Sequence, residues 1–280
     1  MNIEKTIIGG AQSLKNSNIK NPYLDSELLL SKVIKKDRKY MILNSKKKLN
    51  FRYLENFNNL VSRRRRGEPV AYLTNSKEFL KQKYFVNKHV LIPRPDSEIL
   101  VEETLKLYEK KKKIKVLDIG TGSGCLLLSI LKERRNFFGN GVDISKNAIN
   151  IAEFNAKLQQ LNNRVKFYIS DIDKFLIGKY DLILSNPPYI KKFDLKYLDN
   201  DVVFYEPKIA LDGGSDGFSE ITKVINKAAE LIKKNGKFVL EIGHNQRNET
   251  INRLINKSFY INKVVKDYGK NDRCIISTKI

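Results

Sequence analysis

The chain has 280 residues, 41% of them hydrophobic, and a formal net charge of +22 from 53 Lys and Arg against 31 Asp and Glu. This length predicts two domains, and the absence of any apolar run long enough to cross a bilayer, or of a signal-peptide pattern, excludes a membrane protein and indicates the cytoplasm. The positive charge admits nucleic acid as a partner without requiring it, because the lysines do not concentrate in one stretch. Two cysteines and two histidines without ligand spacing predict neither a metal site nor a disulfide.

Residues 1–75 are predicted to form a small helical domain, because apolar residues recur at helical spacing. Its last helix ends in the four arginines 63–66, followed by Gly67 and Pro69, which is typical of a helix stop. Contact with phosphates is the alternative role for these arginines, and the capping role is the simpler interpretation. Helices are expected over residues 3–14, 22–33, 38–43 and 51–66.

Residues 70–95 change to short β-like pieces that begin at Val70-Ala-Tyr-Leu73. We interpret 76–95 as a β-hairpin linker between two domains, stiffened by the prolines on both sides of Arg94. Ser97 is then expected to cap a helix over 98–108.

Residues 96–280 alternate strands with helices from Ile114 onward, a pattern that predicts an α/β domain with a mostly parallel sheet. The long, poorly periodic stretch 191–215 is expected to be a loop over the active site. Strands are expected over 114–118, 137–143, 165–170, 180–185, 236–242, 259–266 and 273–279. Helices are expected over 125–134, 146–161, 217–234 and 246–257.

A glycine loop follows the first of these strands in the run Asp118-Ile-Gly-Thr-Gly-Ser-Gly124. Its G-x-G-x-G spacing departs from the dinucleotide fingerprint, so it favours a ligand lying close to the backbone over a wrapped pyrophosphate. Asp143 ends the next strand, about 20 residues later, where an acidic side chain holds the ribose hydroxyls of a nucleoside. The alternative for Asp143 is to cap the helix that starts near Lys146. Together the loop and Asp143 predict a site for a nucleoside without phosphates.

The run Asn186-Pro187-Pro188-Tyr189 ends the strand 180–185 and turns sharply, because proline cannot continue a ladder. A turn at the carboxyl end of a parallel strand opens into the crevice where α/β sheets bind ligands. The side-chain carbonyl of Asn186, the backbone carbonyl of Pro187 and the ring of Tyr189 suit a planar group that carries an NH₂. The alternative is a plain turn that ends a strand.

Both motifs resemble those of class I S-adenosylmethionine-dependent methyltransferases, and the Asn-Pro-Pro-Tyr turn resembles that of enzymes methylating planar amide or amine nitrogen. With Gly67–Thr74, Leu91–Glu98 and Tyr205–Pro207 added, the chain is similar to the release-factor glutamine methyltransferases, the PrmC or HemK family, from about Gly67 to the C-terminus. The resemblance implies a Rossmann-like, seven-stranded methyltransferase domain with one antiparallel strand, preceded by a small helical domain and a β-hairpin linker.

The resemblance also implies S-adenosyl-L-methionine as cofactor, and methyl transfer to the glutamine nitrogen in the Gly-Gly-Gln motif of peptide-chain release factors. The protein is expected to act as a monomer, with the helical domain holding the release factor. Where the family commonly has an aromatic residue against the adenine, this chain has Ile172, and Phe175 could substitute. The residues implied for the cofactor are Gly120, Thr121, Gly122, Ser123, Gly124, Asp143, Asp171, Ile172 and Asn186.

For the substrate, Asn186 and Pro187 would accept the two N–H bonds of the glutamine amide, and Tyr189 would flank its plane beside Pro188. Three alternatives remain open from the sequence. The same turn serves adenine-N6 methyltransferases acting on DNA or RNA. A glutamine of a ribosomal protein is a second acceptor, although the Ile92–Glu98 segment favours release factors. An RNA-binding protein with a degenerate pocket is a third interpretation, but it would require a damaged glycine loop or Asn186, and neither is damaged.

Overall fold

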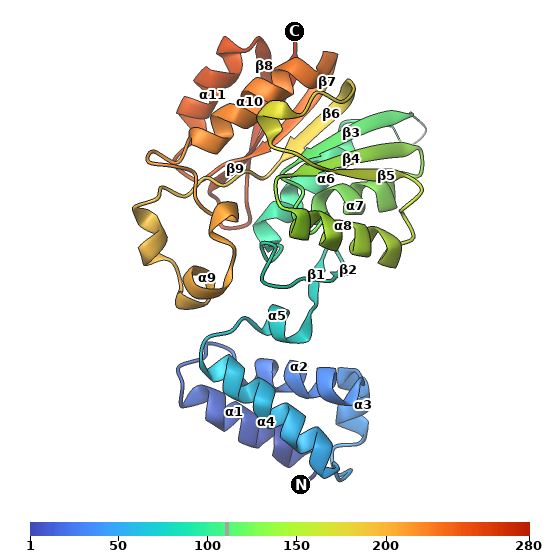
Figure 1. Cartoon of the computed structure of the whole chain (residues 1–280), viewed down its shortest axis with the longest axis vertical. Coiled ribbons are helices and arrows are strands. Elements are labelled where there is room, and N and C mark those ends of the chain that lie inside the picture. The colour runs from blue at the N-terminus through green and yellow to red at the C-terminus, as the bar shows by residue number, and fades with distance from the viewer. Residues whose placement is uncertain (110–111) are drawn as a thin grey trace. The chain divides into compact units, whose positions relative to one another are not determined.

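The computed structural model describes residues 1–109 and 112–280 (Figure 1). The chain divides into two compact units. The first contains Met1–Ser76 and Asp199–Tyr205, and the second contains Lys77–Leu198 and Glu206–Ile280. The stretch 199–205 therefore leaves the second unit, joins the first, and returns.

The first unit is a helical bundle around one apolar core. Asn2 caps its first helix by accepting from Lys5 N at 2.9 Å, and Pro22 begins the second, where its missing N–H costs nothing. Gly10 lets the helices approach, because a Cβ there would lie 2.5 Å from Phe57 Cζ. The helices are α1 (Ile3–Lys15), α2 (Pro22–Ile34), α3 (Arg38–Leu43), α4 (Phe51–Arg65), α5 (Val70–Thr74) and α9 (Asn200–Tyr205).

The arginines at the end of α4 have partners inside this unit. The Nε atom of Arg64 lies 2.7 Å from Asp25 Oδ2, and both side chains are buried. Arg63 pairs with Glu68 at 2.5 Å, and Arg65 donates to Ser17 Oγ at 3.1 Å. These contacts favour the structural interpretation of the cluster over phosphate binding.

The expectation of β-like structure at residues 70–73 was wrong, because this stretch forms α5. Pro69 starts the helix, Asn75 ends it in a left-handed conformation, and Ala71, Tyr72 and Leu73 are all buried. Three consecutive buried residues give no alternation, so periodicity alone could not identify a helix this short.

In the second unit, a hairpin of β1 (Lys77–Phe79) and β2 (Gln82–Tyr84) precedes a seven-stranded sheet built from described residues. The strand order is β5-β4-β3-β6-β7-β9-β8, and β9 is antiparallel to both of its neighbours. The expected α/β fold with a mainly parallel, Rossmann-like sheet is confirmed. The strands are β3 (Ile114–Ile119), β4 (Phe137–Asp143), β5 (Val165–Ile169), β6 (Tyr180–Ser185), β7 (Ile232–Glu241), β8 (Phe259–Lys266) and β9 (Asp272–Lys279).

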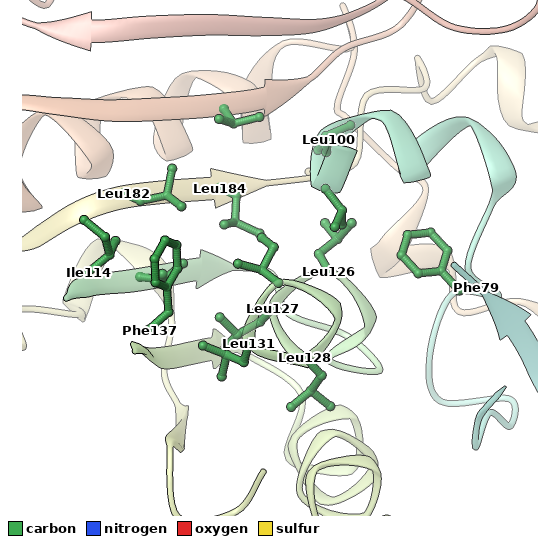
Figure 2. Packing of buried hydrophobic residues seen from close by; sticks show 14 of the residues in the cluster. Phe79, Leu100, Ile114, Leu126, Leu127, Leu128, Leu131, Phe137, Leu182 and Leu184 are labelled. Carbon is green, nitrogen blue, oxygen red and sulfur yellow. The ribbon is translucent and has the colours of Figure 1, made fainter. Parts of the chain in front are cut away.

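Helices cover both faces of this sheet (Figure 1). On one face Leu127 and Leu131 of α7 pack toward the strands, Leu128 points away from them (Figure 2), and Gly139 of β4 leaves room for Leu127. Each fully buried leucine contributes about 1.5–3 kcal/mol through burial. The helices on this face are α6 (Glu98–Lys106), α7 (Cys125–Glu133) and α8 (Lys146–Leu158), and those on the other are α10 (Ser219–Leu231) and α11 (Arg247–Asn256).

Two further differences from the sequence predictions concern element ends. Ser97 does not cap α6 through its side chain, which has another partner described below. Helix α10 ends at Leu231, three residues early, because Ile232 already pairs with Tyr180 in the sheet. In the described part of the chain, no helix is both long enough and apolar enough to cross a membrane.

Candidate cofactor and substrate site

A cavity of about 560 Å³ lies in the second unit at the carboxyl ends of β3, β4 and β6 and beyond β5. This edge is where parallel sheets bind ligands, because the connecting loops diverge there. The volume falls within the usual range for small-molecule sites, roughly 300–1,000 Å³. Its walls come from the glycine loop, the ends of β4, β5 and β6, the segment before α6, and residues 207–214.

The glycine loop after β3 forms one wall of the cavity. The N–H groups of Gly120 and Thr121 both donate to Val142 O, at 2.9 and 3.0 Å, which fixes the loop to β4. Gly120 has φ +73°, and a Cβ added there would meet nothing within 4 Å, so a ligand can approach the backbone closely. Gly124 has φ +80° but packs toward Leu128 and does not line the cavity.

The side chain of Asp118 supports this loop through a hydrogen bond, and the sequence did not identify Asp118 as a functional residue. Its Oδ2 accepts from Thr121 Oγ1 at 2.7 Å, and the side chain is buried. Burial raises the pKa of Asp118 to about 7, the Thr121 hydrogen bond lowers it, and the charge of Asp143 raises it. The loop therefore rests on a carboxyl group that titrates near neutral pH.

Asp143 lines the cavity at the end of β4. One carboxylate oxygen accepts from Gly122 N and the other from Ser145 N, both at 2.9 Å. The helix α8 is capped by Ser145, whose hydroxyl accepts from Ala148 N, so Asp143 is not its N-cap. Burial raises the pKa of Asp143, against the lowering effect of these two backbone hydrogen bonds. Each oxygen retains a lone pair for a ligand hydroxyl.

Asp171 and Ile172 follow β5 and also line the cavity. The suggestion that Phe175 could stand against the adenine was wrong: its side chain is buried in the core beside Tyr168, with ring centroids 5.5 Å apart. Ile144 and Ile172 instead supply aliphatic surface to the cavity.

Asn186, Pro187 and Pro188 line the cavity at the end of β6. The amide nitrogen of Asn186 donates to Ser97 Oγ at 3.1 Å, which commits one side of this group. Its carbonyl oxygen and that of Pro187 accept no hydrogen bond from residues 1–109 or 112–280. Two acceptors are thus available to a ligand at the same turn.

Tyr189 is oriented differently from its neighbours, since it does not line the cavity within the described structure. Its hydroxyl donates to Glu241 Oε1 and accepts from Arg273 Nη1, each at 3.2 Å. Its backbone carbonyl accepts from the buried Gln246 at 3.1 Å. Hydrogen bonds therefore hold both the hydroxyl and the backbone carbonyl of Tyr189.

Arg94 and Glu206 belong to stretches that carry the family resemblance, but the sequence did not indicate that they contact each other. Arg94 lies in the wall and pairs with the buried Glu206 at 2.5 Å, and Glu206 also accepts from Ile92 N at 3.0 Å. These contacts fix the stretch after Glu206, so Lys208 and Ile209 reach the cavity. Only the fold brings this stretch, far along the chain from Arg94, to the same wall.

The donor and acceptor set fits S-adenosylmethionine. A nucleoside needs close backbone approach, which Gly120 allows, and an acceptor for its hydroxyls, which Asp143 offers. The cationic sulfonium end suits a cavity whose lining carries the carboxyl groups of Asp143 and Asp171 and the two free carbonyls at Asn186 and Pro187.

Two family models match the chain: "PrmC N-terminal domain" over residues 6–74 and "Methyltransferase domain" over residues 110–275. A release factor glutamine methyltransferase of Clostridium acetobutylicum is 36% identical, with 100% of this chain and 99% of the relative covered. A bifunctional methyltransferase of Rickettsia conorii is 32% identical, over 99% of this chain and 58% of the relative.

Among solved structures, a methyltransferase from Pyrococcus furiosus aligns with TM-score 0.54 and 19% identity, over 79% of this chain and 98% of that one. At this identity the likeness bears on the fold alone.

Proposed function

The chain belongs to the release factor glutamine methyltransferase family and is an S-adenosylmethionine-dependent methyltransferase, and on that premise we propose its substrate and the residues that act on it. It transfers the methyl group to the side-chain amide nitrogen of the glutamine in the Gly-Gly-Gln motif of peptide-chain release factors. The observation that carries this proposal is the pair of free carbonyl acceptors at Asn186 and Pro187.

An amide nitrogen is a poor nucleophile, because its lone pair is delocalised into the carbonyl. Asn186 Oδ1 and Pro187 O accept its two N–H bonds and turn the lone pair toward the methyl group. Positive charge developing on the nitrogen strengthens both hydrogen bonds in the transition state, so they raise the rate as well as binding the substrate. Tyr189 does not line the cofactor cavity, so its proposed place is at the substrate, flanking the amide plane beside Pro188, with its ring fixed through the hydroxyl.

The cofactor supplies an activated methyl group on a sulfonium. Gly120, Thr121, Gly122 and Ser123 would hold its amino-acid and ribose portions along the backbone, and Asp143 would accept from the ribose hydroxyls. Asp171, beside Ile172, would accept from the adenine amine. Alignment of the two reactants supplies most of the acceleration, so the proposed mechanism needs no strong base: the thioether S-adenosylhomocysteine leaves, and the methylated nitrogen, acidic because of its positive charge, releases one of its two protons to solvent.

We retain the division into a helical substrate-recognition domain at 1–75, a linker at 76–95 and a methyltransferase domain at 96–280 as part of this proposal. Its support is that the cavity is lined by residues of the second unit, so the helical unit is available to hold the release factor. The protein is proposed to act as a monomer in the cytoplasm.

The test is transfer of a labelled methyl group from S-adenosylmethionine to three candidate acceptors: a release factor, a ribosomal protein and unmethylated DNA. The proposal expects label on the release factor, and none when the glutamine of its Gly-Gly-Gln motif is replaced by alanine. Label on DNA or on the ribosomal protein instead would overturn it.

A further inference from the structure

A buried polar cluster of Ser97, Glu241 and Arg273 contacts the Asn-Pro-Pro-Tyr turn, and the mechanism proposed above gives these three residues no role. Glu241 ends β7 with 2% of its surface exposed, and the side chain does not line the cavity. Its Oε1 accepts from the Tyr189 hydroxyl at 3.2 Å. Its Oε2 is buried without a hydrogen-bond partner of regular geometry in the described chain. A buried carboxylate with an unsatisfied oxygen is costly, which calls for a reason to keep it.

Ser97 connects this carboxylate to Asn186. Its Oγ accepts from Asn186 Nδ2 at 3.1 Å, so its own proton is left to donate elsewhere. Burial raises the pKa of the Glu241 carboxyl to about 7, and Ser97, Arg273 and Tyr189 lower it, so Ser97 lies near this carboxyl although no hydrogen bond of regular geometry joins the two in the described chain. One carboxylate is thus adjacent to both side chains of the turn.

We propose that Glu241 is a positioning residue that fixes the direction of the Asn186 amide, through Ser97, and the place of the Tyr189 ring. An ionised carboxylate can only accept, so the Ser97 proton, which the Asn186 contact leaves free, would donate to it, while Ser97 Oγ keeps its observed role as acceptor from the Asn186 nitrogen. The Asn186 carbonyl then points to the substrate, as the proposed function requires. This inference rests on that function and adds a residue to its mechanism.

Protonation of Glu241 would reverse the donor and acceptor roles along the contacts from Glu241 through Ser97 to Asn186. Its O–H could donate to Ser97, which would then donate to Asn186 and bring the amide oxygen inward, with the NH₂ group facing the substrate. The NH₂ group would oppose the substrate N–H bonds. The charged and titratable groups around Glu241 are Asp96 before α6, Cys125 of α7, Tyr189, and Arg273 and Cys274 of β9.

Arg273 holds the other side of the cluster. It donates to Tyr189 Oη at 3.2 Å, to Ile242 O at 3.2 Å and to Asp267 Oδ2 at 2.9 Å. Its charge lies near Glu241 and supports the ionised form, so the cluster favours an accepting carboxylate above neutral pH.

The test compares Glu241→Gln with the wild-type protein, with Glu103→Gln as the matched loss of another buried carboxylate, one that bridges Lys106 and Lys263. On release factor at pH 8, Glu241→Gln is expected to lower kcat roughly ten- to a hundred-fold, as small misplacements do. Calorimetric affinity for S-adenosylmethionine should stay within twofold. In the wild type kcat should fall as the pH drops through about 7, and this pH dependence should be absent in Glu241→Gln.

A double-mutant cycle and a spectroscopic readout complete the test. Ser97→Ala combined with Glu241→Gln should lower kcat no more than the more damaging of the two single substitutions, because both break the same chain of contacts. The ¹⁵N side-chain signal of Asn186 should titrate near pH 7 in the wild type and not in Glu241→Gln, whatever the substrate.

Unchanged kcat and pH profile in Glu241→Gln, a fully additive cycle, or an equal defect in Glu103→Gln would overturn the inference. An Asn186 signal that does not respond to pH would overturn it without any activity measurement. Failure of the wild-type protein to methylate release factor would instead overturn the proposed function, and the Asn186 signal would still decide the role of Glu241.

Discussion

Replacing Asp143 tests the cofactor half of the site. The carboxylate already accepts from Gly122 N and Ser145 N, both at 2.9 Å, so ligand hydroxyls must use its remaining lone pairs. Losing a hydrogen bond to a charged acceptor costs about 1.5–3 kcal/mol. Since 1.4 kcal/mol is tenfold, Asp143→Ala should weaken binding of S-adenosylmethionine by about 10- to 150-fold.

Asp143→Asn should weaken cofactor binding almost as much as Asp143→Ala does. Both oxygens of Asp143 face a backbone N–H, so either orientation of the Asn amide would place an NH₂ group against a donor. If the ligand needed only one acceptor oxygen at this position, Asp143→Asn would keep most of the affinity that Asp143→Ala loses. The comparison of Asp143→Asn with Asp143→Ala therefore examines the hydrogen-bond geometry itself.

The assay is calorimetric titration with S-adenosylhomocysteine or S-adenosylmethionine at pH 8, with thermal unfolding of the free protein measured beside it. Ser145→Ala is the control, because it removes the α8 cap, worth about 1 kcal/mol of stability, without touching the cavity. Its affinity should match the wild type. Affinity within twofold of wild type for Asp143→Ala would refute the ribose assignment.

Three further outcomes are expected. Asn186→Ala should lower kcat about a hundred- to a thousand-fold with near-normal affinity for release factor, measured by steady-state kinetics and direct binding; wild-type turnover would make Asn186 only a turn residue. Because burial raises the pKa of Asp118 to about 7 and a cationic cofactor favours the ionised carboxyl, affinity should rise as pH increases through 7 and then level off. A flat affinity from pH 6 to 8 would contradict this coupling. Arg64→Ala should lower the free energy of unfolding by about 3–5 kcal/mol, because it leaves Asp25 buried and unpaired, whereas the exposed Arg65→Ala should change it by under about 0.5 kcal/mol in denaturant titration. Equal effects of the two changes would refute the role of the pair.

The strand and helix order of the second unit was predictable because each element carries its own period and each strand ends in turn residues. Asn186 and Asp143 were predictable as candidates for the same reason: both sit directly after strands whose carboxyl ends share one edge of a parallel sheet. Val70–Thr74 was not, since a single turn of buried residues has no readable period.

Ser97 and Glu241 illustrate what the sequence could not supply. Ser97 preceded a helical pattern and suggested a cap, but its hydroxyl is used by Asn186, which lies far along the chain. Glu241 is the last residue of β7, after a buried apolar run, where a carboxylate gives no periodic signal. Its neighbours Tyr189 and Arg273 come from other strands and loops, so only tertiary structure reveals the cluster.

Methyl transfer to one glutamine side-chain nitrogen is tested most directly by locating the methyl group. Purified protein is incubated with S-adenosylmethionine and unmethylated release factor, and the peptide that contains Gly-Gly-Gln is sequenced by tandem mass spectrometry. We expect one added methyl group on the glutamine side-chain amide, and none with Asn186→Ala over the same time. A methyl group on any other residue, or an unmodified peptide from the wild-type reaction, would contradict it.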